Sequence, residues 1–325
     1  MRYIDLYLSG ELKKRASLAE EYLNNCNICP NNCYISRIEN KMGACYSRYL
    51  PIVSSYTLHF GEEPALVGEN GVGNIFFGNC NLKCKYCQNF EISQNYKNEI
   101  KNEVTFERLA EIMLELQEKK ANAIGLVSPT HFVPQILKSL VIAIEKGLRI
   151  PLVYNSNGYD SVEMLKLLDG IIDIYLPDIK YGNNDYSKEF SGIKNYFNSA
   201  KLAVKEMYRQ KGYKIIYNDK GVVTSGLIIR HLVLPNDLAE TEEVLKFIAN
   251  ELDNRITVSL MSQYNPLFKA NNIPLLSRKL RYSEYERAIT LLEKYNITNG
   301  WLQELESSDN YLPNFNQNRE NPFGI

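Results

Sequence analysis

The chain has 325 residues, and 45% of them are hydrophobic, which is enough apolar material for one large domain or two smaller ones. Its 37 basic and 38 acidic residues give a formal net charge of -1, so no global field favours nucleic acid or a membrane surface. No segment approaches the ~18 uninterrupted apolar residues of a membrane span, and the first residues lack the apolar core of a signal peptide. We therefore expect a soluble, cytoplasmic protein that binds neither nucleic acid nor membrane.

The first part of the chain carries four of the seven cysteines. Residues 1–25 predict a helical lead-in and residues 51–67 an extended section. Between them lie Cys26, Cys29, Cys33 and Cys45. An odd, clustered set of cysteines suits metal ligation better than disulfides. Four soft ligands in so short a stretch predict a closed tetrahedral site for either zinc or a second iron-sulfur cluster, because spacing alone rarely separates the two.

Beyond this region, short apolar runs alternate with amphipathic segments. The apolar runs predict buried parallel strands at 75–77, 123–127, 151–154, 171–176, 227–234 and 256–261. The amphipathic segments predict helices at 106–116, 136–144, 160–168, 196–207, 244–252 and 283–292. Asp160 and Glu163 have the spacing of a capping box at the third helix.

Six strand and helix pairs in strict alternation predict an α/β fold, a partial (β/α)6 barrel of the TIM type. We place the barrel at residues 71–296. Residues 1–70 are then a small N-terminal lobe with the four-cysteine site, and residues 297–325 are a C-terminal extension.

Three further cysteines, Cys80, Cys84 and Cys87, directly follow the first predicted strand in CxxxCxxC spacing. Thiolates at such spacing are iron-sulfur ligands. A cubane cluster has four irons, so three thiolates leave one iron without a protein ligand, and an open position is typical of a catalytic metal site. A zinc knuckle or a plain electron-transfer cluster would need a fourth ligand nearby. From residue 88 onward there is no cysteine, and the two histidines, His131 and His231, lie far along the chain.

This motif, with Tyr86 before its third cysteine, resembles the radical S-adenosylmethionine (SAM) superfamily, in which SAM chelates the fourth iron through its amino and carboxylate groups. More narrowly, the chain resembles the pyruvate formate-lyase activating enzyme-related (PflX-like) proteins, on the glycyl-radical-enzyme activase side of the superfamily. The blocks that carry this likeness are 58–64, 80–94, 129–135, 154–159, 175–181 and 260–266. The likeness covers roughly residues 26–295.

The resemblance implies a [4Fe-4S] cluster that receives an electron from a donor such as flavodoxin or ferredoxin. It implies cleavage of SAM to a 5′-deoxyadenosyl radical, which takes a hydrogen atom from a substrate. The narrower likeness, to the activase-related proteins, implies that this substrate is a backbone glycine of a glycyl radical enzyme. The sequence names no catalytic residue beyond the cluster ligands.

Barrel enzymes place their chemistry at the carboxyl ends of the strands. The polar residues there are our candidates for SAM binding: Ser128, Thr130, Asn155, Asn157, Asp178 and Arg230. Related activases have a Gly-Gly-Glu stretch for the SAM amino group, where this chain has Val127-Ser128-Pro129-Thr130. An arginine at position 230 suits a bidentate contact with the SAM carboxylate. We interpret Glu62 and Glu63 as a solvated turn.

Two alternatives stay open. The first is radical SAM chemistry on another protein, a peptide or a small molecule; the lack of a spare cysteine disfavours the epimerases among such enzymes. The second is an iron-sulfur or zinc module that transfers electrons or scaffolds a partner. That module predicts a cluster whose spectrum does not respond to SAM.

Overall fold

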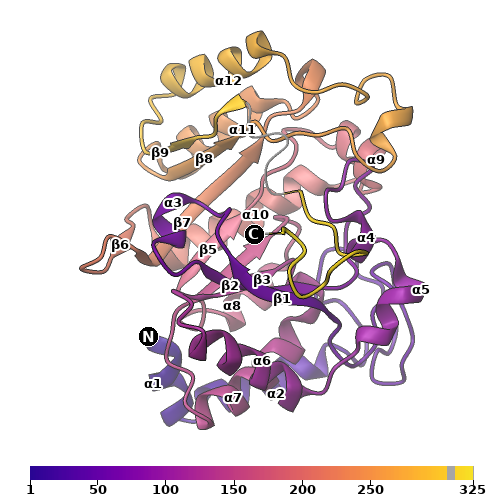
Figure 1. Cartoon of the computed structure of the whole chain (residues 1–325), viewed down its shortest axis with the longest axis vertical. Coiled ribbons are helices and arrows are strands. Elements are labelled where there is room, and N and C mark those ends of the chain that lie inside the picture. Colours follow the sequence, from indigo (N-terminus) through magenta and orange to yellow (C-terminus); the bar gives the residue numbers. More distant parts are fainter. Residues whose placement is uncertain (306–311, 325) are drawn as a thin grey trace.

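The computed structural model describes residues 1–305 and 312–324, and its centre is a mostly parallel sheet of nine strands (Figure 1). Eight strands follow in the order β1-β2-β3-β4-β5-β7-β8-β9, and β6 pairs with β7. Only the pairs β1-β2 and β6-β7 are antiparallel. The strands are β1 (Val53–His59), β2 (Val72–Phe77), β3 (Ile124–Val127), β4 (Leu152–Ser156), β5 (Ile174–Pro177), β6 (Ile216–Tyr217), β7 (Val223–Leu232), β8 (Thr257–Met261) and β9 (Gly300–Leu302).

The predicted α/β class is confirmed, and each of the six predicted strands is present, as β2, β3, β4, β5, β7 and β8. The predicted helices between them are α6 (Phe106–Glu118), α7 (Val133–Glu145), α8 (Val162–Leu167), α10 (Tyr196–Lys211), α11 (Thr241–Phe247) and α12 (Tyr282–Lys294). The other α-helices of the described residues are α1 (Arg2–Leu8), α2 (Glu11–Glu21), α3 (Pro64–Val67), α4 (Phe90–Ser93), α5 (Tyr96–Glu99) and α9 (Asp185–Ser191). Helix α11 continues as a π-helix, Ile248–Asp253. Among the described residues, no helix has the length and apolarity to cross a membrane.

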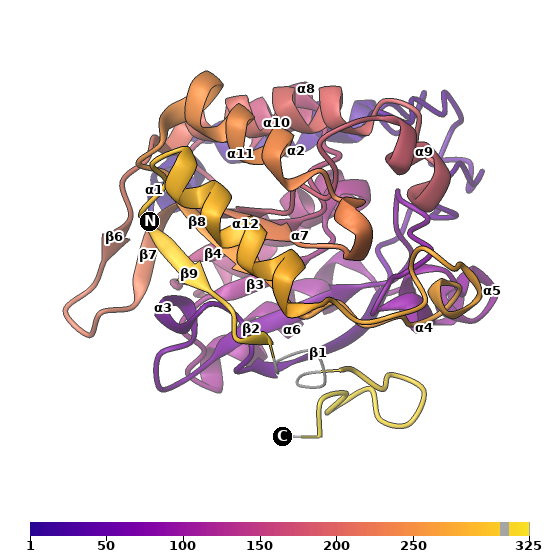
Figure 2. The same ribbon diagram turned by 90° about the horizontal axis from the view of Figure 1, so that it is seen from above.

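The parallel strands are buried on both faces of the sheet, which is why their sequences are nearly continuous apolar runs. Helix α7 buries apolar residues at helical spacing, and α2 and α6 lie against it (Figure 1). Figure 2 shows β9 at the edge of the sheet. Because the parallel strands run in one direction, their carboxyl ends meet at one end of the sheet. That end is where the candidate site lies.

The sheet extends beyond the predicted barrel at both edges. On one side β1, from the predicted N-terminal lobe, pairs with β2. On the other side β9 pairs with β8, past residue 296. Gly300 permits this approach, because a Cβ atom there would lie 1.8 Å from the Val258 carbonyl oxygen. The ends of the strand order, β1 and β9, are not paired with each other in the described chain, so the sheet stays open.

The N-terminal helices share the main hydrophobic core with the barrel through residues such as Tyr3, Leu12 and Ala19. The segment that follows, residues 22–50, contains no helix or strand. The fully buried Arg37 ties it to the barrel, donating to the Arg48 carbonyl oxygen at 2.6 and 2.9 Å and to the His131 carbonyl oxygen at 2.6 Å. The four-cysteine segment is therefore packed on the barrel rather than separate from it.

We expect Arg37→Met to lower the free energy of unfolding by about 3 kcal/mol, because two buried carbonyl groups lose their donor. Urea denaturation measures this. The matched control is Arg287→Met, whose side chain is 62% exposed in a surface ion pair with Asp237, and its loss should stay below about 1 kcal/mol. Equal losses in the two variants would contradict the role of Arg37.

Candidate active site

A cavity lies at the carboxyl ends of the parallel strands, and the three cysteines of the CxxxCxxC motif lie in its wall. The loop that carries them directly follows β2. Polar side chains from β4, β5 and β7 and from the turns after them also line the cavity, together with Pro313 and Phe323 of the C-terminal segment. The fold thus brings together three thiols and a polar pocket from distant parts of the chain.

Each of the three thiols lies beside a hydrogen-bonding group. The Ser191 hydroxyl donates to the Cys84 sulfur at 3.0 Å. The Leu82 backbone N–H donates to the Cys80 sulfur at 3.4 Å, and the Cys87 sulfur lies 3.2 Å from the Ser93 hydroxyl oxygen. Such donors stabilise thiolates and tune the potential of a bound cluster.

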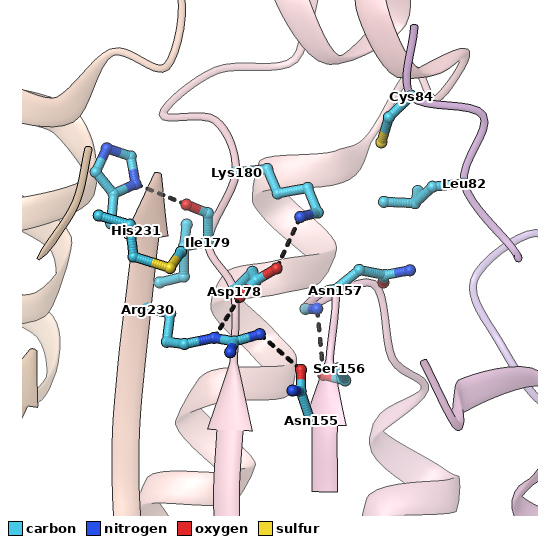
Figure 3. A network of polar contacts seen from close by, with 12 residues as sticks. Leu82, Cys84, Asn155, Ser156, Asn157, Asp178, Ile179, Lys180, Arg230 and His231 are labelled. Atoms are coloured by element: carbon cyan, nitrogen blue, oxygen red, sulfur yellow. Dashed lines mark hydrogen bonds and ion pairs between the residues drawn. The ribbon is translucent and has the colours of Figure 1, made fainter. Parts of the chain in front are cut away.

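The Arg230 guanidinium is the centre of the polar wall (Figure 3). Its Nε donates to Asp178 Oδ1 at 2.8 Å, its Nη2 to Asn155 Oδ1 at 2.6 Å, and its Nη1 to Glu62 Oε2 at 3.0 Å. The second oxygen of Asp178 accepts from Lys180 Nζ at 2.7 Å. Burial works against ionisation of Asp178, but the two cations outweigh it and lower the pKa of that carboxyl. Asp178 is therefore a buried carboxylate between two cations.

The turns that carry Asp178 and Lys180 are fixed by residues behind them. The Tyr196 hydroxyl accepts from the Lys180 backbone N–H at 2.9 Å and lies 2.8 Å from the Asn157 carbonyl oxygen, to which it donates. His231 Nδ1 lies 2.7 Å from the carbonyl oxygen of Ile179. These contacts hold the turns after β4 and β5 in register with each other.

Five of the six candidate SAM residues line this cavity: Ser128, Asn155, Asn157, Asp178 and Arg230. Ser128 has a left-handed backbone, with φ at +55°, a conformation that glycine adopts at least cost and that often marks functional sites. Contact of these residues with SAM stays a prediction.

Thr130 does not line the cavity. Its hydroxyl donates to Asp160 at 2.6 Å, and the same carboxylate accepts from Tyr154 at 2.8 Å and from Ser156 at 2.7 Å. The predicted capping box at Asp160 and Glu163 is therefore wrong, since helix α8 begins after Ser161. Three buried hydroxyl donors hold Asp160 more firmly than one backbone N–H would.

Sequence reasoning missed Glu62, which is 9% exposed and lines the cavity instead of forming a solvated turn. Its Oε1 accepts from Asn74 Nδ2 at 2.9 Å and from Asn155 Nδ2 at 3.4 Å, in addition to the Arg230 contact at Oε2. Strand β1 is antiparallel to β2, so a residue that follows β1 is not expected at the carboxyl ends of the parallel strands. No signal in the sequence therefore indicates Glu62.

The four N-terminal cysteines lie close to one another and next to backbone donors. The Ala44 N–H donates to the Cys33 sulfur at 3.3 Å. Burial raises the pKa of the Cys29 thiol, and negative charge on Cys45, Cys26 and Cys33 raises it further. Within residues 1–305 and 312–324, no three histidine, cysteine, aspartate or glutamate side chains form a ready-made metal site. Ligation by these cysteines, and by those of the CxxxCxxC motif, stays a prediction.

Comparison with known proteins decides the family. Residues 74–224, which include the CxxxCxxC motif, match the model of the radical SAM superfamily. The uncharacterized protein MJ0674 of Methanocaldococcus jannaschii is 37% identical over 293 residues, which are 88% of this chain and 79% of that protein. This chain belongs to the radical SAM superfamily. Membership implies reductive cleavage of SAM at an iron-sulfur cluster, with a [4Fe-4S] cluster and SAM as cofactors and electrons supplied by a reductase.

Two further matches are more distant. The uncharacterized protein MJ0808 of the same organism is 26% identical over 272 residues, 77% of this chain and 73% of that protein. The solved structure of the cobalamin-dependent SAM radical enzyme OxsB with aqua-cobalamin bound matches 67% of this chain but only 30% of that chain, at 11% identity and a TM-score of 0.35. We draw no argument from that structure. The PflX-like subfamily stays a prediction.

We expect Glu62→Gln to lower the free energy of unfolding by about 1–3 kcal/mol, because Arg230 loses one of its buried carboxylate partners. The matched control is Glu69→Gln on the same loop, where the side chain is exposed and the change should stay within about 0.5 kcal/mol. Both values come from urea denaturation of anaerobically purified protein. Small, equal effects would restore the interpretation of Glu62 as a solvated residue.

Proposed function

We propose that Cys80, Cys84 and Cys87 hold the [4Fe-4S] cluster of this radical SAM enzyme and that SAM binds in the cavity beside them. One observation carries the proposal: the three sulfurs of the family motif share one cavity with a buried network of Arg230, Asp178, Lys180 and Glu62. SAM has an amino group, a carboxylate and a sulfonium, so its pocket needs charges of both signs. This cavity has them.

The donor set fits the cluster. Three soft sulfur ligands, each beside a hydrogen-bonding group, are the chemistry that iron-sulfur clusters take from proteins. When bound, the reduced cluster supplies the electron that divides SAM into methionine and a 5′-deoxyadenosyl radical. The protein's own task is to orient SAM and exclude water.

The positively and negatively charged residues suit different groups of SAM. Arg230 and Lys180 are donors suited to the SAM carboxylate, while Glu62 and Asp178 are acceptors suited to its cationic groups. Around them, the aromatic rings of Phe76 and Phe323, 5.7 Å apart between centroids, border the cavity and keep water from part of its wall.

For the substrate, we propose hydrogen abstraction from a backbone glycine of a partner enzyme, which would make this chain a glycyl-radical-enzyme activase. The support is the likeness of the sequence blocks at 58–64, 154–159 and 175–181 to the activase-related proteins. Incubation with a candidate partner encoded beside the gene, followed by electron paramagnetic resonance (EPR), tests this step. A stable glycyl radical is expected, and abstraction confined to a peptide or a small molecule would contradict it.

We also propose that Cys26, Cys29, Cys33 and Cys45 hold a second metal centre. Its support is the backbone around these thiols. Gly43 lets the chain pass over Cys33, because a Cβ atom there would lie 2.7 Å from the Cys33 sulfur. Close backbone packing with N–H groups beside sulfur is typical of metal-thiolate loops.

Anaerobically reconstituted protein with SAM and dithionite should form 5′-deoxyadenosine, measured by chromatography. Cys84→Ala should abolish the product, because the cluster loses one of its three ligands. Absence of product from protein that holds an intact [4Fe-4S] cluster would contradict the proposed function. A cluster spectrum that ignores SAM would then favour the redox or scaffold module.

A further inference from the structure

The two cysteine sites are joined by direct contacts between their loops. Asn31 lies between Cys29 and Cys33, and Asn81 lies between Cys80 and Cys84. The Asn31 side-chain amide donates to the Asn81 carbonyl oxygen at 2.9 Å. Two segments fifty residues apart in the sequence therefore meet at the point where each carries its ligands.

The same contact continues to a catalytic sulfur. The buried Asn81 side chain accepts from Asn157 Nδ2 at 2.8 Å, and that amide also lies 3.4 Å from the Cys80 sulfur. In the other direction, Asn81 Nδ2 donates to the Tyr159 carbonyl oxygen at 2.9 Å. Hydrogen bonds through Asn81 and Asn157 thus link the loop of the N-terminal cysteines to the Cys80 sulfur.

Buried tyrosines fill the rest of that space. The ring of Tyr159 lies 6.1 Å from Tyr196, that ring lies 5.5 Å from Tyr181, and Tyr181 lies 6.3 Å from Tyr86, which lines the catalytic cavity. At the other end, Cys29 borders a second cavity together with Asp160, the neighbour of Tyr159 in the chain. These tyrosines form a row of aromatic rings from Tyr159, which is close enough to Cys29 and Cys33 to feel their charge, to the catalytic cavity. Such a row provides a through-protein route for an electron.

The N-terminal segment does not depend on a metal for its attachment to the barrel. Its residues Cys26 and Ile28 belong to the main hydrophobic core, and Arg37 holds the segment through buried hydrogen bonds. A structural metal is most needed where a small unit has no core of its own. The contacts with the catalytic loop point to a redox role instead.

The N-terminal site is also within reach of an external reductant. Tyr34 and Tyr46, which directly follow Cys33 and Cys45, are 61% and 39% exposed. Cys33 is half-buried, as are Cys80 and Cys87 of the catalytic motif, and the other four cysteines are buried. An electron donor that touches the surface beside Cys33 and Cys45 therefore approaches the four-cysteine site directly.

We propose that Cys26, Cys29, Cys33 and Cys45 hold a second [4Fe-4S] cluster that passes electrons to the one at Cys80, Cys84 and Cys87. This inference rests on the proposed function. One electron leaves a low-potential flavoprotein or ferredoxin and reduces the N-terminal cluster from the 2+ to the 1+ state. It then moves to the catalytic cluster, which changes from 2+ to 1+ while the N-terminal cluster returns to 2+. No bond forms or breaks in this transfer, and the electron is spent on SAM cleavage.

Metal analysis and EPR of the reconstituted wild-type protein test the site itself. We expect iron and sulfide for two clusters, and in the fully reduced protein a signal broadened by magnetic interaction between two nearby spins. The double variant Cys29→Ser/Cys33→Ser should retain one cluster with a sharp signal that still changes on addition of SAM. The reciprocal variant Cys84→Ala should lose the response to SAM. Zinc at the N-terminal site, or two clusters without magnetic interaction, would overturn the inference.

A comparison of two reductants tests the transfer. With flavodoxin and its reductase, the double variant should form 5′-deoxyadenosine about tenfold more slowly than wild type. With dithionite, which is small enough to enter the catalytic cavity, the two rates should agree within about twofold. Equal rates with both reductants, or equal losses with both, would overturn the relay. Failure of the proposed function is distinguished by the wild-type protein, in which the EPR signal of the catalytic cluster would then not change on addition of SAM.

Discussion

The candidate site depends on one buried cation, Arg230, held between two carboxylates. Asp178 comes from the turn after β5 and Glu62 from the loop after the edge strand β1, so the guanidinium on β7 joins segments from three parts of the sheet. Desolvation of three charged groups is costly, and the arrangement persists only because every partner is hydrogen-bonded. Burial works against the charge of Arg230, but negative charge on Asp178, Glu63 and Glu62 outweighs it and raises the pKa of Arg230. The pocket is thus charged in advance, before any ligand arrives.

Neighbouring residues fix the position of the turn that carries these charged side chains. Tyr196 and His231 bind the backbone of the turn that carries Asp178 and Lys180, and Gly158 allows that turn to come close, because a Cβ atom there would lie 2.4 Å from the Asp178 carbonyl oxygen. Such contacts fix charged side chains on rigid elements instead of mobile loops. The carboxyl ends of the strands therefore present a polar pocket of defined shape to the loop of the three cysteines.

Much of the fold follows from patterns within the sequence. Apolar runs long enough to be buried on both faces predict the strands β2, β3, β4, β5, β7 and β8, and the rule that chemistry lies at strand ends places Asn155, Asp178 and Arg230 in the cavity. What the sequence could not predict depends on tertiary partners. Strand β9 has three residues, too few for an apolar pattern that would predict a strand, and it forms by pairing with the edge of β8.

Glu62 and Asp160 illustrate the same limit at the site. The loop after β1 starts at the amino end of β2, where His59 pairs with Val72, so the strand-end rule gives no reason to place Glu62 in the cavity. Asp160 has the local spacing of a helix cap. Its carboxylate instead accepts hydrogen bonds from the hydroxyl groups of Thr130, Tyr154 and Ser156. Local propensity gives way wherever a buried polar group finds better partners.

The measurement that tests the central claim most directly is electron-nuclear double resonance of the reduced protein with SAM labelled with nitrogen-15 at the amino group. If SAM binds the open iron of the cluster at Cys80, Cys84 and Cys87, the labelled nitrogen will couple to the cluster spin. With unlabelled SAM, the nitrogen-15 signal will be absent and a nitrogen-14 coupling will replace it. Tight binding of labelled SAM without any coupling would contradict the account, because SAM would then lie in the protein without contact with the open iron.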